Sequence, residues 1–283
     1  MVRARKRFGQ HFLEPVWVEK LMHVIAPGAD DSFLEIGPGH GALTRPLAAA
    51  TRHVVAVEID RDLVDEMRRA SLANVTVIEG DFLRLTAADV GQALAALDGA
   101  GSVHKARVAG NLPYNVASPI LVRLVEVFMS GVPLVDATVM LQREVAERVT
   151  AVPGTRDYGI LSVLIGLASD ADRLLMLPPG AFRPVPDVTS AVVRLRFRAP
   201  RPLPADQPLF GAMVQAVFSR RRKTLANALK AFAGGSALAP KIALSQAKLD
   251  GRRRPETLSI PELVRLVDIY ASHLRRARLA PGR

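Results

Sequence analysis

Ser32-Phe-Leu-Glu-Ile-Gly-Pro-Gly-His-Gly41 is the stretch of sequence that decides the fold. Its first five residues are mostly apolar, which is typical of a short buried strand, and its glycines let a backbone pass close to a ligand. Residues 42–50 then suit a helix. A strand, a glycine-rich turn and a helix in this order favour a ligand site at the end of a parallel strand. A tight turn with a purely structural role is the alternative interpretation.

The same alternation of strand and helix continues along the next hundred residues. Strands are expected at residues 32–36, 53–59, 75–78, 107–109 and 137–141, with helices between them at 42–50, 61–70, 87–97 and about 119–128. Strands that are apolar on both faces and separated by helices indicate a doubly wound, mostly parallel sheet of the Rossmann-like α/β type. Two later strands, near 173–177 and 190–197, flank a proline-rich loop that cannot form a regular helix.

A second proline-rich segment, residues 198–204, marks a change in pattern. Beyond it the apolar residues follow helical periodicity, with helices expected at 206–219, 221–232, 240–248 and 260–274. We therefore predict two domains: an α/β domain over residues 1–200 and a smaller, all-helical domain over residues 201–283.

The net charge of +11 is concentrated in the second of these domains. Residues 201–283 contain 16 Lys/Arg and 5 Asp/Glu, whereas residues 1–200 contain 22 of each. The first domain also carries a basic arm, Arg3 to Arg7. A solvated surface would explain this pattern, but clustered cations favour a polyanionic partner such as nucleic acid, because binding releases counterions.

Composition excludes several other classes of protein. The absence of cysteine excludes disulfides and cysteine-ligated metals, and the six histidines are dispersed, so no metal site is expected. No apolar run approaches the ~18 residues of a membrane span, and the N-terminus lacks the apolar stretch of a secretory signal. We expect a cytoplasmic monomer with no membrane partner.

Acidic residues follow the strands that succeed the glycine-rich turn. Glu58 ends the second strand and can accept hydrogen bonds from ribose hydroxyls, while Asp81 follows the third and can accept from an adenine amino group. The turn has neither the G-x-G-x-x-G spacing of dinucleotide sites nor a P-loop lysine. Acidic groups would repel a pyrophosphate but suit a sulfonium cation. These features favour S-adenosylmethionine over NAD.

Asn111-Leu-Pro-Tyr114 follows the fourth strand and is the most specific motif of the chain. An Asn-initiated turn before proline is the alternative interpretation. The amino nitrogen of adenine is a poor nucleophile, because its lone pair is delocalised into the ring. The Asn111 side-chain oxygen and the Leu112 carbonyl can accept its two hydrogens and aim its lone pair at a methyl group. Pro113 stiffens the turn, and Tyr114 can stack on the base.

Taken in order, the motifs of this chain resemble those of the ribosomal RNA adenine dimethyltransferases. The resemblance covers about residues 5–229 and comprises Arg7-Phe-Gly-Gln-His-Phe-Leu13, Glu35-Ile-Gly-Pro-Gly-His-Gly41, Val57-Glu-Ile-Asp60, Gly80-Asp81, Gly110-Asn-Leu-Pro-Tyr-Asn115, Phe182-Arg-Pro-Val-Pro-Asp-Val-Thr-Ser-Ala-Val-Val193 and Phe218-Ser-Arg-Arg-Arg-Lys-Thr-Leu-Ala-Asn-Ala-Leu229. It implies a class I methyltransferase fold and dimethylation of two adjacent adenosines in the 3′-terminal hairpin of 16S rRNA, in the immature 30S particle.

The resemblance also implies roles for individual residues. The cofactor site would be lined by His11, Leu13, Gly37, Gly39, Glu58, Asp81, Phe82 and Asn111, and position 11 is His where the pattern often has Asn. Phe182 would be the second aromatic ring beside the target base, with Asn111, Leu112, Pro113 and Tyr114 forming the rest of the catalytic set. The residues expected to contact RNA phosphates are Arg5, Lys6, Arg7, Arg221, Arg222 and Lys223.

Two other functions remain open at this point. One is the related 23S rRNA adenine N6-methyltransferase of the macrolide-resistance type, although the Leu of Asn-Leu-Pro-Tyr and the Arg-Arg-Lys-Thr-Leu stretch favour the small-subunit enzymes. The other is an RNA- or DNA-binding factor in which catalysis is secondary, such as a ribosome-assembly checkpoint or a mitochondrial transcription factor of this superfamily. The intact Asn111-Leu-Pro-Tyr114 motif favours retained activity.

Overall fold

A computed structural model describes residues 12–96, 105–232 and 238–279 of the chain. The contacts divide it into two compact units. The first unit is Met1–Glu147 with Ala168–Arg198, and the second unit is Arg148–Leu167 with Ala199–Arg283. The sequence suggested a single division after residue 200, whereas the contacts group residues 148–167 with the C-terminal helices. None of the helices in the described ranges is long and apolar enough to cross a membrane.

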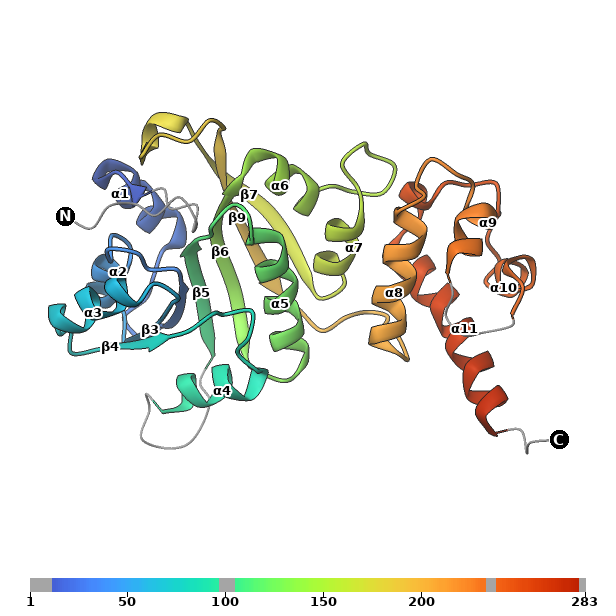
Figure 1. Cartoon of the computed structure of the whole chain (residues 1–283), viewed down its shortest axis with the longest axis horizontal. Helices are drawn as coiled ribbons and strands as arrows, with labels where there is room; N and C mark the ends of the chain where they lie inside the picture. Colours follow the sequence, from blue (N-terminus) through green and yellow to red (C-terminus); the bar gives the residue numbers. More distant parts are fainter. Residues whose placement is uncertain (1–11, 97–104, 233–237, 280–283) are drawn as a thin grey trace. The chain divides into compact units, whose positions relative to one another are not determined.

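Strands and helices alternate along most of the first unit (Figure 1). The strands are β1 (Phe12–Leu13), β2 (Ser32–Ile36), β3 (His53–Glu58), β4 (Val75–Glu79), β5 (Ala106–Asn111), β6 (Leu134–Gln142), β7 (Ser169–Leu177), β8 (Phe182–Arg183) and β9 (Ser190–Phe197). The helices from the N-terminus to the end of the second unit are α1 (Pro15–Ile25), α2 (Thr44–Ala50), α3 (Arg61–Ala70), α4 (Ala87–Ala95), α5 (Ala117–Met129), α6 (Arg143–Val149), α7 (Ile160–Gly166), α8 (Gln207–Phe218), α9 (Leu225–Ala228), α10 (Pro240–Gln246) and α11 (Ile260–Leu279).

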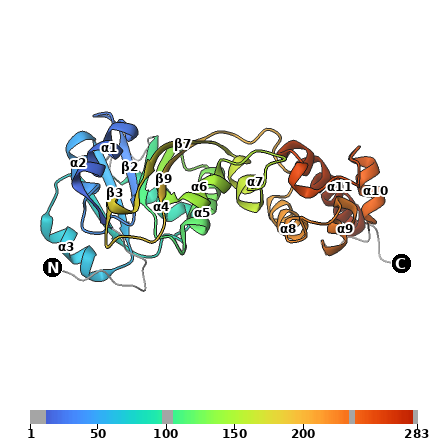
Figure 2. The same ribbon diagram turned by 90° about the horizontal axis from the view of Figure 1, so that it is seen from above.

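Seven strands form one sheet in the order β4-β3-β2-β5-β6-β9-β7. Strands β2 to β6 pair in parallel, and β9 pairs antiparallel with both β6 and β7. Helices cover both sides of this sheet, as Figures 1 and 2 show. The prediction of a mostly parallel, doubly wound sheet followed by a helical region is confirmed. The strand order reverses beside β2 and β5, which is where sheets of this type bind ligands.

The end of α1 is fixed to the sheet by a largely buried arginine, Arg107. Arg107 on β5 is 13% exposed and makes a two-pronged ion pair with Asp136 on β6. The same guanidinium donates to the carbonyls of Ile25 and Ala26, which end α1, and to Asp31. A helix end leaves carbonyls without partners, so these bonds satisfy them while they hold α1 against the strands.

Glycine is required where β2 and β5 approach each other at the carboxyl edge. A Cβ atom added at Gly110 would lie 2.6 Å from the carbonyl oxygen of Ile36. That distance is well inside normal contact, and the atom in the way is backbone, which cannot rotate aside. Gly110 therefore allows the ends of the two central strands, and the loops that follow them, to meet.

Several elements differ from the sequence-based expectation. Helices α6 and α7 were not anticipated, and neither was the small two-stranded sheet in which β1 pairs with β8. The helix expected over 221–232 is wrong at its start, because α9 begins only at Leu225. The amides of Leu225 and Ala226 donate to the carbonyls of Arg253 and Gly251, so tertiary hydrogen bonds replace the helical ones.

We predict that Gly110→Ala destabilises the protein, because either β2 or β5 must move to relieve the contact with Ile36. Overpacking of this kind costs about 1–3 kcal/mol in the free energy of unfolding. Urea denaturation measures the change. Gly91→Ala is the matched control within the same unit: it lies inside α4, its added Cβ meets only Val132 at 3.7 Å, and removing a helical glycine stabilises by about 0.5–1 kcal/mol. Equal stability of the two variants would contradict the role given to Gly110.

Candidate active site

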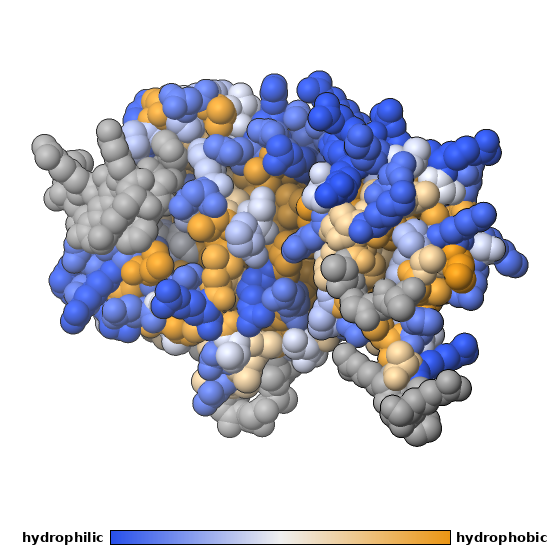
Figure 3. Space-filling model, turned by 45° about the vertical axis from the view of Figure 1, so that its right-hand side comes forward, coloured by the Kyte–Doolittle hydropathy of each residue, from blue (hydrophilic) through white to orange (hydrophobic). Residues whose placement is uncertain are grey.

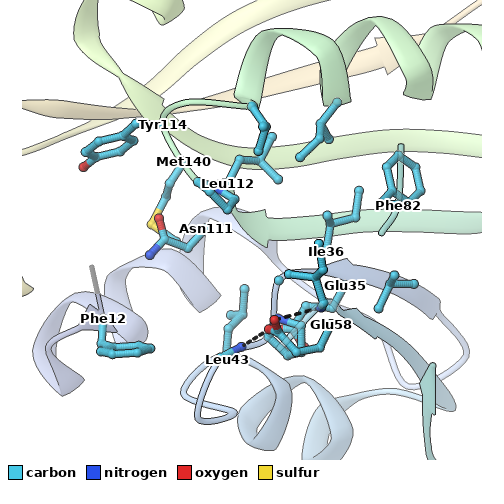
Figure 4. A pocket seen from close by; sticks show the side chains of 18 of the residues that line it. Phe12, Glu35, Ile36, Leu43, Glu58, Phe82, Asn111, Leu112, Tyr114 and Met140 are labelled. Carbon is cyan, nitrogen blue, oxygen red and sulfur yellow. Dashed lines mark hydrogen bonds between the residues drawn. The ribbon is translucent and has the colours of Figure 1, made fainter. Parts of the chain in front are cut away.

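A cavity of about 270 Å³ opens at the carboxyl ends of the parallel strands. Figure 4 shows side chains from β2, β3 and β5 converging on it. The residues that line it include all but two of those expected in the cofactor and catalytic sets, namely Leu13, Gly37, Gly39, Glu58, Asp81, Phe82, Asn111, Leu112, Pro113 and Tyr114. Leu13 and Phe82 are buried beside it. Of the other two, His11 lies outside the described residues, and Phe182 lies elsewhere.

The glycine-rich loop takes a conformation that side chains rarely adopt. Gly37 and Gly39 have φ angles of +69° and +59°. A Cβ at Gly39 would also lie 3.1 Å from the ring of Phe12, which packs over the loop and stacks obliquely on His40 at a centroid distance of 4.5 Å. His40 is held in turn by Glu66 on α3, at 3.0 Å. Phe12 belongs to the Arg7–Leu13 motif, but the sequence analysis gave it no role of its own.

Glu58 connects this loop to the neighbouring strand and helix. Its Oε2 accepts from the amide of Gly39 at 3.1 Å, and its Oε1 accepts from the amides of Ile59 and Asp60 at 2.9 Å each. Glu58 is 6% exposed. Burial raises the pKa of its carboxyl group, and the three amide donors oppose this increase. Oε1 already accepts two hydrogen bonds, so the further lone pair available for a ribose hydroxyl is on Oε2.

Glu35 is a second carboxyl group in the same cavity, and sequence reasoning assigned it no separate role. It is 1% exposed, and its Oε2 has no hydrogen-bond partner among the described residues. Burial raises its pKa to about 8; the nearby Thr44 hydroxyl lowers it only in part, and the charge of Glu58 raises it further. The sequence signal that could have singled out Glu35 is the presence of an acidic residue inside an otherwise mostly apolar strand.

The Asn111-Leu-Pro-Tyr114 turn forms the other wall of the cavity. Asn111 ends β5 opposite Met140 on β6, and Leu112 is buried at 1% exposure. The Tyr114 hydroxyl lies 2.6 Å from the hydroxyl of Ser190, which is fully buried at the start of β9. Burial raises the pKa of Tyr114, and the bond to Ser190 opposes that increase. The tyrosine ring is thus fixed at its outer end.

Phe182 does not lie where the resemblance implied. Its ring is fully buried in an apolar cluster with Leu13, Leu177 and Val192, and β8 pairs it directly with Leu13. The expectation that Phe182 stacks on the target base is corrected for this structure, since the ring is already covered by aliphatic side chains. The proline-rich loop brings Phe182 under the small β1–β8 sheet, a pairing that the sequence did not predict.

The expected phosphate contacts divide between described and undescribed residues. Arg5, Lys6 and Arg7 lie outside the described residues. Arg222 and Lys223 are exposed in the turn between α8 and α9. Arg221 is partly buried, and its Nη2 donates to the carbonyl of Arg156 at 2.8 Å, so it also stabilises the second unit.

Comparison with known proteins identifies the family. The model of the ribosomal RNA adenine dimethylase family matches residues 1–271. The chain belongs to this family. It is accordingly an S-adenosylmethionine-dependent methyltransferase, and the predicted family, enzyme class and cofactor are confirmed.

Named relatives and solved structures agree with that membership. The chain is 41% identical over 283 residues to the "Ribosomal RNA small subunit methyltransferase A" of Aromatoleum aromaticum, covering 97% of each chain. A dimethyladenosine transferase from Plasmodium falciparum shares the fold, with a TM-score of 0.72, 23% identity and coverage of 93% and 98% of the two chains. The 23S rRNA methyltransferase ErmE has a TM-score of 0.61 and 25% identity, covering 91% of this chain and 98% of its own.

The cavity of this family member fits the cofactor chemically. Two buried carboxyl groups, Glu35 and Glu58, face it from adjacent strands (Figure 4), and Oε2 of Glu35 has no hydrogen-bond partner among the described residues. Such an environment suits a ligand that carries positive charge and ribose hydroxyls. Gly37 and Gly39, which have positive φ angles and no side chain, allow the protein backbone to approach such a ligand closely.

We predict that Tyr114 acts through its ring face, with the hydroxyl serving to position the ring. Tyr114→Phe should keep methyl transfer within a few-fold of the native rate, whereas Tyr114→Ala should slow it by roughly one to two orders of magnitude, since stacking contributes ~1–3 kcal/mol per base. Single-turnover transfer of labelled methyl groups measures both.

Ser190→Ala is the matched control, because it removes the same hydrogen bond from the other side. It should behave like Tyr114→Phe. If Tyr114→Phe were as slow as Tyr114→Ala, the hydroxyl would be the working group and the stacking role would be wrong.

Proposed function

We propose that this protein transfers methyl groups from S-adenosylmethionine to N6 of two adjacent adenosines in the 3′-terminal hairpin of small-subunit rRNA. The observation that carries the proposal is the meeting of two motifs at one sheet edge: the carboxyl groups of Glu35 and Glu58 on one wall of the cavity, and the Asn111–Tyr114 turn on the other. Identity of 41% over nearly the whole length to a relative named for the small subunit supports this substrate.

The roles of the residues follow from the chemistry of the amino group. When bound, S-adenosylmethionine supplies a methyl group on a sulfonium sulfur. Asn111 and the Leu112 carbonyl accept the two amino hydrogens of the adenine, which turns the nitrogen lone pair toward that methyl group. With the cofactor bound beside Glu58, the methyl group would pass from sulfur to this nitrogen, and the nitrogen would release one proton to solvent. Placement of this kind is worth an effective molarity of ~10⁵–10⁸ M.

An adenosine must leave its stack to reach the cavity. Extrusion costs a few kcal/mol, and Tyr114 offers a ring face that recovers part of that cost. With Phe182 covered in the core, Tyr114 is the aromatic residue of the Asn111–Tyr114 turn that lines the cavity.

The second unit offers a basic surface for the RNA backbone. The turn that carries Arg222 and Lys223 is joined to a second arginine-rich turn, residues 250–254, by the amides of Leu225 and Ala226. Arg252 in that second turn has a 90% exposed side chain and forms an ion pair with Asp250 at 3.2 Å. Hydrophilic side chains also project over much of the face shown in Figure 3. Two adjacent basic turns can contact successive phosphates, with the arm Arg3–Arg7 as a further candidate.

The substrate particle, location and oligomeric state are part of this proposal. We infer that the protein acts as a cytoplasmic monomer on the immature small subunit, where the hairpin is still accessible. The two-domain organisation supports a division of work between an α/β unit that binds the cofactor and a helical unit that contacts RNA. The macrolide-resistance activity is less well supported, given 25% identity to ErmE against 41% to the small-subunit relative.

The position of the transferred methyl group shows which RNA and which atom the protein methylates. Tritiated cofactor offered with immature small subunits should yield N6,N6-dimethyladenosine at two adjacent positions, as determined by nucleoside mass spectrometry and mapping of the label. Large subunits serve as the control and should stay unlabelled. Label in 23S rRNA, on cytosine or on a ribose oxygen would contradict the proposed function.

Charge reversal tests the RNA surface. Arg222→Glu with Lys223→Glu should weaken RNA binding and flatten the slope of log affinity against log salt by about 0.7–0.9 for each lost phosphate contact. Filter binding at several salt concentrations measures the slope. Lys20→Glu is the control, since Lys20 lies over the Trp17 ring in the first unit. An unchanged slope in the double variant would move the RNA path elsewhere.

A further inference from the structure

Glu35 and Glu58 share one cavity but differ in how their charge is satisfied. Glu58 accepts hydrogen bonds from three backbone amides. Glu35 lies on the neighbouring strand, is also buried, and has an oxygen, Oε2, with no hydrogen-bond partner in the part of the chain that the structure describes. A buried carboxylate without donors or a counter-ion is strongly unfavourable, so such a group either holds a proton or awaits a cation.

The surroundings of Glu35 favour the first state when the cavity holds no cation. The groups facing it are the hydroxyl of Thr44, a buried residue at the start of α2, and the carboxyl of Glu58 on β3. On β3 and β5 its register partners are Ala56 and Ala109, which carry no charge. Within the described ranges no basic side chain forms an ion pair with Glu35. Its pKa of about 8 agrees with a protonated group at neutral pH.

We propose that Glu35 is a proton-linked counter-ion for the cofactor: it holds a proton when the cavity lacks a cation, and releases that proton to solvent when the positively charged end of S-adenosylmethionine binds. The exchange is balanced, since one positive charge enters the cavity as one proton leaves. This inference rests on the proposed cofactor site, which it deepens by giving Glu35 a role separate from that of Glu58.

Two positive groups of the cofactor could cause the release. The sulfonium is present in S-adenosylmethionine and absent from its demethylated product, whereas the α-ammonium is present in both. If the sulfonium is the partner of Glu35, only binding of the methylated cofactor makes Glu35 release its proton, and the site then binds S-adenosylmethionine in preference to its demethylated product. If the ammonium is the partner, binding of either ligand makes Glu35 release its proton.

Calorimetry of the native full-length protein tests the proposal. Titration with S-adenosylmethionine at pH 7, in two buffers of different ionisation enthalpy, gives the number of protons released per cofactor. A group with a pKa of about 8 is mostly protonated at this pH, so we expect close to one proton to be released for each cofactor bound. The same titration with the demethylated product distinguishes the sulfonium from the ammonium.

Two variants locate the source of the proton. Glu35→Gln is a neutral isostere of the protonated acid; it should reduce the release to near zero and weaken cofactor affinity by about ten-fold or more. Glu79→Gln is the matched control, because Glu79 is the register partner of Glu58 at the same sheet edge but is exposed and does not line the cavity. It should leave both quantities unchanged. Any proton exchange by the ligand's own amino group is common to all three proteins and cancels in the comparison.

A second measurement on the cofactor-free protein is independent of binding. The carboxyl of Glu35 ionises near 4.5 when unfolded and only near 8 when folded, so between these values the native state holds more protons. Stability from this group therefore falls as pH rises from about 5 to 8. The melting temperature of Glu35→Gln relative to the native protein should rise across that range.

The outcomes separate this inference from the proposed function. Tight cofactor binding without proton release, or with release that persists in Glu35→Gln, would overturn the role of Glu35 and leave the cofactor site standing. No cofactor binding by the native protein would contradict the cofactor site itself. A Glu35→Gln protein whose relative melting temperature is independent of pH would overturn the protonated state.

Discussion

The buried carboxylate of Glu58 is the constraint on which the site depends. Its three amide hydrogen bonds tie the end of β3 to the glycine-rich loop after β2 and to the start of α3. A buried charge is stable only when it is bonded in this way, so the loop must take the left-handed turns that Gly37 and Gly39 allow. The same bonds leave the carboxylate facing the cavity. Loop geometry and cofactor chemistry thus follow from one interaction.

The two walls of the cavity differ in the charge of their side chains. Glu35 and Glu58 place two carboxyl groups on one wall, whereas the Asn111–Tyr114 turn places neutral acceptors and an aromatic face on the other. Neutral acceptors can orient an amino group without protonating it. Gly110 contributes to the spacing of the walls, since a Cβ atom at this position would clash with the backbone of Ile36 on β2. Ser190 then fixes the Tyr114 ring from an antiparallel strand distant in sequence.

Sequence patterns predicted the features that depend on residues close together in the chain. The apolar runs of the parallel strands, the glycine turn and the Asn-Leu-Pro-Tyr motif were visible in the sequence, and so were the residues they carry to the sheet edge. Contacts between distant segments were not visible in the sequence. The pairing of β1 with β8 buries Phe182, and the hydroxyls of Tyr114 and Ser190 lie together although the two residues are 76 positions apart. Glu35 was hidden for another reason, because its importance lies in a missing partner, which only the packed structure reveals.

We infer that the Asn111 side chain orients the target nitrogen at the sheet edge where the cofactor binds. Asn111→Ala tests this role, with affinity for small-subunit RNA by filter binding and single-turnover methyl transfer to the same RNA measured on one preparation. We expect RNA affinity to change by no more than a few-fold while transfer falls by several orders of magnitude. Loss of RNA affinity in step with transfer, or transfer that continues near the native rate, would contradict this role.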